Sequence, residues 1–563
     1  GDYNEDFGDE LYMIEERAGD GHGDKASFGF SNELISTDDL LKKLNKDEDH
    51  VLDEASYIRA RLFDMLIGDW DRHEDQWRWA VFKDNGKTTY RPVPRDRDQA
   101  FSIMSNGALL GFATSVIPSL RLMKSYDEDL KSPKWFNLEP YPLDMALINQ
   151  SNKSVWDAEV KQIVDGLTDA VIDNAFTNFP AEVNDNTVKN IKRKLKGRRA
   201  NLQNISNNYY AHINKYAVIK GTNKDDWFDV ERLPNGKTKV TAYRIKKEKK
   251  DVVFHQRTYS RNITKEIWIY GLDDDDVFNV IGSGKKNNIS IRIIGGQNND
   301  IYNIKNSSKL IVYDYKSKKN TFITKKGRKN LTDNYNTNVY DYKKLKYHQI
   351  QIVPNANYNP DDGISLGITQ TFTDYGFKRN PFTSKYRFSV ATYLATNGFD
   401  VNFNSEFAHV YNRFNFGFDI HITSPNYSKN FFGYGTDSKN LNYTDEHNFS
   451  ENYNRVKTRT IKIAPYFILP GQFGSEFKIE ASFEYFKTKN DPRRYLSIFY
   501  NNNPQLKQKN TFLGIEATYA FENQDNKAFP TLGMKANFTV GYKNNIDNAN
   551  SIAYLIPTLS FDY

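Results

Sequence analysis

From about residue 346 to Tyr563, the sequence is a succession of segments in which apolar and polar side chains alternate. Alternation with a period of two predicts β-strands that have one apolar and one polar face. The clearest of these segments cover residues 386–393, 414–422, 460–468, 478–486, 512–521 and 535–542. Strands of roughly ten residues, about ten of them in succession, are typical of an antiparallel barrel that crosses an outer membrane.

The connections between these segments favour the same interpretation, because such barrels alternate short periplasmic turns with long outer loops. The longest connections, at about 425–454 and 488–510, follow the fifth and seventh predicted strands. Tight connections at 410–413 and 470–474 follow even-numbered strands. If the first strand runs outward from the periplasm, every long loop therefore lies outside. A soluble β-sandwich with long hairpins is the alternative.

Composition agrees with a membrane barrel and excludes several other classes of protein. The chain combines 36 Tyr and 38 Phe with a mean hydropathy of −0.73, which is unusual for a soluble enzyme. The sequence has no run of about 18 apolar residues, so it predicts no transmembrane helix. The absence of cysteine excludes disulfides, thiolate zinc sites and cysteine nucleophiles. A formal charge of +6 is too mild to indicate a nucleic-acid partner, and we expect none.

The motif Phe529-Pro-Thr-Leu-Gly533 leads directly into a predicted strand and resembles the FPTxG element of BamA-like surface-antigen barrels. These are the sixteen-stranded assembly and secretion proteins of Gram-negative envelopes. In this sequence Pro530 would end a turn and Gly533 would admit a bend before the strand. The family's long loop with an arginine-glycine-aromatic motif is missing. We therefore expect a larger barrel that is incomplete in this chain, the alternative being a barrel closed by about ten strands.

The strongest signal for a chemical site lies in the first part of the chain, in segments 66–77 and 90–101. A helix predicted over 50–70 leads into the first segment, and a hairpin over 77–93 would bring the second segment back to it. Carboxylates brought together in this way are what a divalent metal and phosphoryl transfer require. The alternative is an ion-pair network that joins the helix to the hairpin through Asp71, Arg72, Asp96 and Arg97.

These two segments resemble the catalytic loop and metal-binding segment of atypical kinases, namely HipA-like kinases, the secretory-pathway casein kinase and the CotH spore-coat kinases. The resemblance implies that Asp71 is the catalytic base and that His73 orients the loop. It also implies that Gln76, Asp96 and Asp98 bind Mg²⁺ with ATP, although the family usually has Asn or Glu in place of Gln76. The hinge between kinase lobes would be residues 11–17. The lobe that holds ATP would precede it, so an active enzyme and a pseudokinase both stay open.

The two acidic motifs followed by a barrel resemble large Gram-negative envelope proteins with three parts. In those proteins a calcineurin-like phosphoesterase domain precedes a kinase-like part and a surface-antigen barrel. The resemblance covers essentially all of this chain. The metal motifs of the phosphoesterase domain are not found in this sequence. Phosphoesterase activity would therefore lie outside it.

Between these parts, residues 268–280 are echoed by residues 292–304, each with an apolar strand, a glycine turn, an aspartate and an alternating strand. This pair resembles a β-roll, in which turn carbonyls and Asp side chains bind Ca²⁺ between stacked coils. Asp273, Asp276 and Asp300 are then the candidate ligands, and an unliganded roll is the alternative.

A basic run at 192–199 lies in a helix predicted over 188–216. The run is either a solvated face of that helix or a site for a phosphate or lipid headgroup.

The sequence thus predicts a multidomain protein. A helical, kinase-like α+β domain covers 1–217, a β-roll-like domain covers 218–345, and an antiparallel outer-membrane β-barrel covers 346–563. We expect residues 1–345 in the periplasm, with the lipid bilayer and envelope proteins as partners. The expected function is envelope or outer-membrane protein biogenesis, or export. A membrane-tethered, Mg²⁺-dependent phosphotransferase and a pseudokinase scaffold anchored by the barrel are the alternatives.

Overall fold

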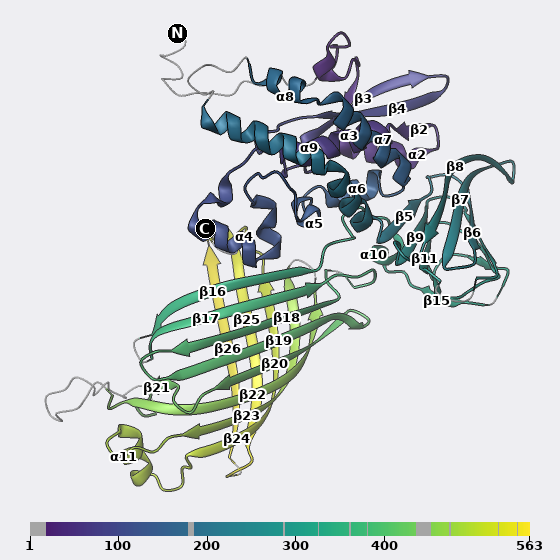
Figure 1. Cartoon of the computed structure of the whole chain (residues 1–563). Helices are drawn as coiled ribbons and strands as arrows, with labels where there is room; N and C mark the ends of the chain where they lie inside the picture. The colour runs from purple at the N-terminus through teal and green to yellow at the C-terminus, as the bar shows by residue number, and fades with distance from the viewer. Residues whose placement is uncertain are drawn as a thin grey trace. The chain divides into compact units, whose positions relative to one another are not determined.

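The computed structural model describes residues 19–177, 185–284, 288–324, 326–359, 362–379, 381–434, 452–471, 474–526, 529–548 and 550–562. The chain forms two compact units, Gly1–Leu345 (unit 1) and Lys346–Tyr563 (unit 2) (Figure 1). Unit 1 contains a helical part and a β part, and unit 2 contains one large antiparallel sheet. The predicted hinge at 11–17 lies outside the described residues. No helix in the described ranges is long and apolar enough to cross a membrane.

The first part of unit 1 packs helices against a small sheet of order β1-β3-β4-β2. In this sheet β3 and β4 form the predicted antiparallel hairpin, and β2 runs parallel to β4. The elements are η1 (Ala26–Phe28), β1 (Leu34–Ile35), α2 (Thr37–Lys46), β2 (His50–Leu52), α3 (Glu54–Ile67), η2 (Glu74–Gln76), β3 (Trp77–Asp84), β4 (Lys87–Pro94), η3 (Met104–Asn106), α4 (Ala108–Val116), η4 (Pro118–Met123), α5 (Pro133–Phe136), α6 (Tyr141–Leu147), α7 (Lys153–Gly166), α8 (Asp169–Ala175) and α9 (Asn186–Ile213).

The helix that leads to the first acidic motif is shorter than predicted. Residues 50–52 form β2 instead, because their backbone pairs with β4. Helix α3 begins after Asp53, whose carboxylate accepts the backbone N–H of Ser56 as an N-cap. It ends at Gly68, which has a φ of 81°. A Cβ at Gly68 would lie 2.6 Å from the Tyr126 ring, so only glycine suits this left-handed position.

Residues 153–175 form two helices, α7 and α8. The chain breaks between them because Thr168 is the N-cap of α8, with its hydroxyl oxygen accepting the backbone N–H of Val171. The basic run 192–199 lies within α9, in agreement with the predicted helix. Its cations at Lys196 and Arg199 pair with Asp169, which lies on α8.

The second part of unit 1 is a β-solenoid, in which successive coils stack with parallel strands. One sheet has the order β15-β13-β11-β9-β5, and the other has β14-β12-β10-β6 extended by antiparallel β7 and β8. Trp268 pairs with Arg292 and Val277 with Ile301, so the two units found in the sequence are adjacent coils. The elements are β5 (Tyr216–Lys220), β6 (Asp226–Arg232), β7 (Lys237–Lys246), β8 (Lys249–Ser260), β9 (Glu266–Leu272), β10 (Val277–Gly282), β11 (Ser290–Gly296), β12 (Ile301–Ile304), β13 (Leu310–Asp314), β14 (Thr321–Phe322), β15 (Arg328–Leu331) and α10 (Tyr335–Asn338).

An aromatic stack runs through the core of the solenoid and shows that it has more coils than the sequence indicated. Phe228, Phe278, Tyr302 and Phe322 stack in that order, with ring centroids 5.0, 5.3 and 4.8 Å apart. Each ring comes from the corresponding position of its coil, on β6, β10, β12 and β14. Aromatic rings bury much apolar area and prefer such offset contacts, so this column joins the coils through side chains as well as strands.

Unit 2 is a single antiparallel sheet whose path runs from β16 to β26, with β21 paired only to β22. The prediction of about ten strands is confirmed, and the long connections follow β20 and β23. The sheet is strongly curved (Figure 1), and within the described residues β16 and β26 do not pair with each other. The elements are β16 (Gln349–Asn359), β17 (Gly363–Asp374), β18 (Ser384–Tyr393), β19 (Gly398–Tyr411), β20 (Phe414–Thr423), β21 (Ser428–Asn430), β22 (Arg455–Pro470), β23 (Ser475–Thr488), α11 (Tyr495–Asn502), β24 (Lys509–Glu522), β25 (Gly533–Asn545) and β26 (Ser551–Asp562).

The tight spacing of the solenoid coils gives a first prediction. A Cβ at Gly271 would lie 1.9 Å from Asp276 Oδ2 and 2.3 Å from the carbonyl oxygen of Gly295. Gly271→Ala should therefore destabilise the solenoid by roughly 1–3 kcal/mol or more, measured as faster hydrogen exchange of the β9 and β11 amides in the whole chain. Gly166→Ala is the matched control, because nothing lies within 4 Å of that Cβ. Unchanged exchange in Gly271→Ala would contradict the close packing of the coils.

Candidate functional site

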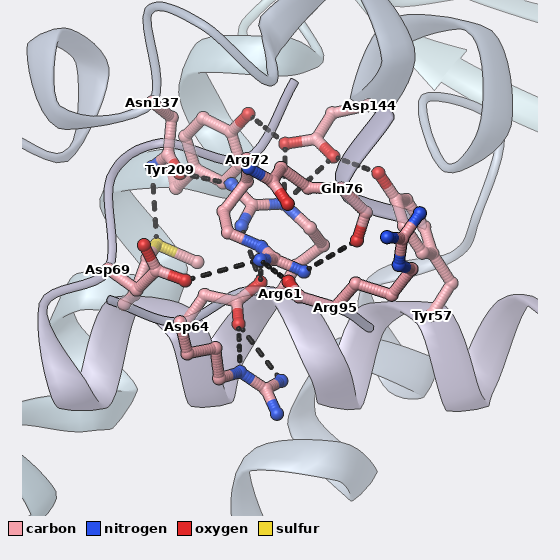
Figure 2. Close-up of polar contacts among 12 residues, drawn as sticks. Tyr57, Arg61, Asp64, Asp69, Arg72, Gln76, Arg95, Asn137, Asp144 and Tyr209 are labelled. Atoms are coloured by element: carbon pink, nitrogen blue, oxygen red, sulfur yellow. Dashed lines mark hydrogen bonds and ion pairs between the residues drawn. The ribbon is translucent and has the colours of Figure 1, made fainter. Parts of the chain in front are cut away.

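Helix α3 carries a cation and an anion into the interior of unit 1, as Figure 2 shows. Arg61 and Asp64 lie one turn apart, are both fully buried and pair at 2.9 Å. Arg61 also lies 3.1 Å from Asp144, which accepts the hydroxyls of Tyr57 and Tyr209 at 2.9 and 2.5 Å. Buried ions are costly unless each is paired and hydrogen-bonded. This set meets that condition and fixes α3 against α6 and α9.

A second buried cation, Arg72, follows α3 in the first acidic motif. Its Nε lies 3.3 Å from Asp64, and its Nη1 lies 3.3 Å from Asp69. Arg97, from the second motif, also pairs with Asp64 at 3.0 Å. Both arginines of the predicted network therefore form ion pairs. Their shared partner is Asp64, however, which the sequence pattern did not single out.

The Arg72 guanidinium also binds the backbone of both motifs (Figure 2). It donates hydrogen bonds to the carbonyl oxygens of Gln76, Arg95 and Asp96, at 3.1, 2.5 and 2.7 Å. It lies 4.6 Å from the centre of the Trp77 ring, a favourable cation–π distance. One buried arginine thus holds the loop before β3 to the segment after β4, and this contact positions the candidate metal ligands.

Asp69 is a further buried acid that the sequence pattern did not identify. Only 1% of its surface is exposed, and burial raises the pKa of its carboxyl to about 7, against the opposing effect of Arg72. Strongly shifted acids beside a cation are enriched at functional sites. Its position directly after the helix-ending Gly68 is the one sequence signal that could have pointed to it.

The structure brings together some of the predicted site residues. Gln76 Nε2 lies 3.3 Å from Asp96 Oδ2, so the hairpin does join the two motifs. His73 Nδ1 accepts the backbone N–H of Asp75, as the N-cap of η2. Asp71 is half-buried in the same loop, and Asp98 is exposed. Among the contacts of the described residues, neither Asp71 nor Asp98 bonds to Asp96.

The donor set at this loop suits Mg²⁺ in part. Mg²⁺ is commonly held by one or two protein carboxylates, with substrate phosphates and water completing its six ligands. Asp96 supplies one carboxylate, and rotation of the Gln76 amide would turn an oxygen to the same place. Asp96 has a φ of 46°, an uncommon value for a residue other than glycine that is often seen at functional sites. No group of three His, Asp or Glu side chains in the described ranges is close enough to hold a metal ion.

In the solenoid, buried aspartates form a ladder along the coil axis. Asp276 Oδ1 accepts the backbone N–H of Asp226, and Asp300 Oδ1 accepts that of Asp276, at 2.8 and 2.9 Å. Asn320 Oδ1 accepts the N–H of Asp300 at 2.9 Å and continues the column. Each side chain therefore satisfies a buried backbone donor at the turn before its strand.

These carboxyls hold their protons more strongly than usual. Burial raises the pKa of Asp226 to about 7, and burial together with neighbouring carboxyls raises the pKa of Asp276 and Asp300 well above the usual range. Of the three predicted Ca²⁺ ligands, Asp276 and Asp300 are thus joined in the ladder. Asp273 lies apart in the turn, where its Oδ1 accepts the N–H of Asp274 at 3.0 Å. The Ca²⁺ site stays a prediction.

One face of the unit 2 sheet is apolar across most of its width. A single row of paired residues crosses six strands with no polar member, and it consists of Phe388, Phe403, Ile420, Ile463, Phe483 and Leu513. Further along the same face, Tyr519 pairs with Phe538, and Val540 pairs with Leu555. Several side chains on this face are at least half exposed, for example Leu513 at 50%, Ile515 at 58% and Leu555 at 69%. Soluble proteins rarely expose a continuous apolar surface of this extent.

The opposite face of the same sheet is polar and charged. Glu480 is buried there and pairs with Lys462 and Lys478, each at 2.6 Å, and Glu484 pairs with Lys543 at 2.7 Å. A cavity of about 990 Å³ lies against this face, lined by alternate residues that include Gln351, Asn355, Thr369, Thr371, Lys385, Arg387, Ser389 and Asn402. Charges inside and apolar side chains outside are the reverse of a soluble protein.

No protein-family model matches the chain, and no curated protein matches it. Among solved structures, it is similar to the crystal structure of BamA from Haemophilus ducreyi lacking POTRA domains 1–3, with 15% sequence identity and a TM-score of 0.25. The similarity covers 36% of this chain and 35% of that chain. The chain therefore spans about a third of that structure's length, and a likeness of this size does not place it in a family.

The aspartate ladder predicts an unusual pH dependence. The folded state raises the pKa of these carboxyls above about 3.9, the ordinary value for Asp. Between about pH 4 and 7 the folded protein therefore keeps protons that the unfolded chain has released. Stability of the solenoid should therefore fall as pH rises from about 5 to 8. Hydrogen exchange of the β9–β12 amides, corrected for the intrinsic effect of pH, measures this change.

Asp276→Asn should reduce this pH dependence, because an amide keeps the acceptor oxygen, as Asn320 does in the last coil. Asp274→Asn, in the adjoining turn, is the matched control and should keep the parent's dependence. A bound Ca²⁺ would act in the opposite direction, because it needs ionised ligands. Stability that rises with pH when Ca²⁺ is added would therefore contradict the proton-holding ladder and support the cation site.

Proposed function

We propose that unit 2 is a membrane-inserted β-barrel of the outer-membrane type, with its apolar face toward lipid and its polar face toward a lumen. The single observation that carries this proposal is the row of paired apolar side chains across six strands, opposite buried ion pairs on the other face. Lipid-facing and lumen-facing residues alternate in this way along the strands of such barrels. In water, the hydrophobic effect would instead favour burial of these apolar side chains.

The edges of the sheet add a requirement. Unpaired backbone N–H and C=O groups cannot face hydrocarbon, so in lipid β16 and β26 must pair with each other or with further strands. Both solutions give a closed wall around the polar cavity. A wall of this kind, with unit 1 in the periplasm, suits a role in outer-membrane protein biogenesis or export.

A second candidate function is a Mg²⁺-dependent phosphotransferase or nucleotide-binding site in unit 1. The contact between Gln76 and Asp96 favours it, together with the hydrogen bonds by which Arg72 holds both segments. In the kinase-like assignment, Asp71 would accept the hydroxyl proton, and Asp96 with Gln76 would hold the metal. An inactive pseudokinase scaffold would keep the fold without this chemistry.

The barrel assignment predicts opposite results for charges placed on the two faces of β24. Ile515→Arg puts a cation on the apolar face, which should cost roughly 2–4 kcal/mol if the position lies near the bilayer midplane. Thr518→Arg puts the same cation on the polar face and should be tolerated. The measurement is the urea dependence of folding into phospholipid vesicles, read by the heat-modifiable mobility of the folded sheet. Equal cost at both positions would rule out a lipid-facing apolar surface.

The kinase-like assignment predicts that Asp96→Asn weakens binding of Mg²⁺-ATP at least tenfold, because the metal loses its carboxylate. Asp84→Asn, at the exposed tip of the β3–β4 hairpin, is the control and should bind as the parent does. Calorimetric titration with and without Mg²⁺ measures both. Parent protein that binds no nucleotide, or an Asp96→Asn variant that binds it equally well, would leave unit 1 as a scaffold.

A further inference from the structure

A long uncharged segment follows the second acidic motif. No charged residue occurs at positions 99–120, between Asp98 and Arg121, although 26% of the chain is charged. The segment contains η3, α4 and the start of η4. Such a run could form part of the core, but it does not.

The apolar side chains of this segment are exposed to a degree that is rare in unit 1. Leu109 and Phe112 on α4 are 86% and 67% exposed, and Val116 continues the same helical face one turn further on. Ile103 and Met104, just before α4, add to the patch. Apolar residues gathered at helical spacing on a free face indicate a surface that binds something apolar.

A cationic cavity is built by the residues that follow α4. It has a volume of about 130 Å³, and its lining includes Arg121 and Lys124 at the end of η4, Lys131 and the α9 residue Arg198. Asp127 and Asp129 also line it, so its cations exceed its anions by two. The hydroxyls of Ser125 and Ser132 complete a lining that can donate hydrogen bonds to an anion.

Arg198 is the deepest of these cations and differs from its neighbours in the basic run. Only 3% of its surface is exposed, and it lies 4.2 Å from the centre of the Tyr126 ring. Its Nη1 donates to the carbonyl oxygen of Met65 at 3.1 Å and its Nη2 to that of Asp129 at 3.4 Å, whereas its Nε is buried with no hydrogen-bond partner among the described residues. Lys196 and Arg199 instead pair with carboxylates on α8. A buried guanidinium with an unused donor beside three further cations is suited to an anion.

We propose that α4 and this cavity together form a lipid-binding surface on unit 1. The exposed face of α4 inserts into the outer part of a bilayer leaflet, and the cavity receives the phosphate of an anionic phospholipid headgroup. An apolar helical face with adjoining cations matches the two layers of a leaflet, acyl chains and then phosphates. The inference rests on the proposed function, since a membrane-inserted unit 2 keeps unit 1 within reach of a bilayer.

The chain offers a clean test, because it contains no cysteine. Phe112→Cys, Val171→Cys and Ile515→Cys are each labelled with an environment-sensitive fluorophore in the whole chain, reconstituted in nanodiscs. The discs hold phosphatidylcholine with or without phosphatidylglycerol, and a spin-labelled lipid serves as quencher. Val171 on α8 is the matched control, exposed at 45% but away from the patch, and Ile515 reports insertion of unit 2.

We expect quenching at position 112 to exceed that at position 171 several-fold and to increase with phosphatidylglycerol. The double variant Arg121→Gln, Lys124→Gln should remove the increase but keep the basal quenching. Quenching at 515 with none above control at 112 overturns this inference and leaves the proposed function standing. Absence of quenching at 515 overturns both. Loss of the phosphatidylglycerol effect on adding inorganic phosphate would support the cavity as the phosphate site, whereas a phosphatidylglycerol effect that the double variant retains would refute it.

Discussion

Burial of charged and polar groups forces every part of this chain to supply partners within the fold, because an unpaired ion in an apolar interior costs several kcal/mol. In unit 1, Asp64 pairs with both Arg72 and Arg97 and so ties α3 to both acidic motifs. In the solenoid, carboxyls that keep their protons satisfy backbone donors between coils. In unit 2, the ion pairs of Glu480 line one face of the sheet and leave the other face to apolar side chains. The same constraint thus produces three different solutions.

Much of this arrangement could be predicted from local patterns, and the rest depends on contacts between distant residues. Period-two alternation and connection lengths predicted the strands of unit 2, because the alternate residues of each strand determine the polarity of its two faces. The segment 50–52 was wrongly included in a helix, since its strand state arises only from pairing with β4. Asp64, Asp69 and Asp144 were missed for a related reason. An acidic residue is expected to be exposed, because its sequence does not show which arginines the fold places beside it.

The solenoid illustrates why spacing alone does not identify a metal site. The coils repeat the pattern Asp-Asp-Trp-Phe at 225–228, Asp-Asp-Val-Phe at 275–278 and Asn-Asp-Ile-Tyr at 299–302, but at unequal intervals. The β7–β8 hairpin, inserted in the first coil, hides that repeat from a search at a fixed period. The same aspartates that suggest Ca²⁺ ligands serve as acceptors for backbone N–H groups. A carboxylate oxygen already occupied in this way has less capacity for a cation.

Unit 1 also connects its candidate site to its apolar surface through a short, held segment. Only a few residues separate Asp96 from η3, and the backbone N–H of Phe101 donates to the carbonyl oxygen of Ile67 at 3.0 Å. Beyond α4, the N–H of Tyr126 donates to the carbonyl oxygen of Ser102 at 2.7 Å, which closes the segment into a loop. Because both ends are held by backbone hydrogen bonds, the lipid surface proposed for α4 lies on a segment that is anchored close to the candidate metal ligand Asp96.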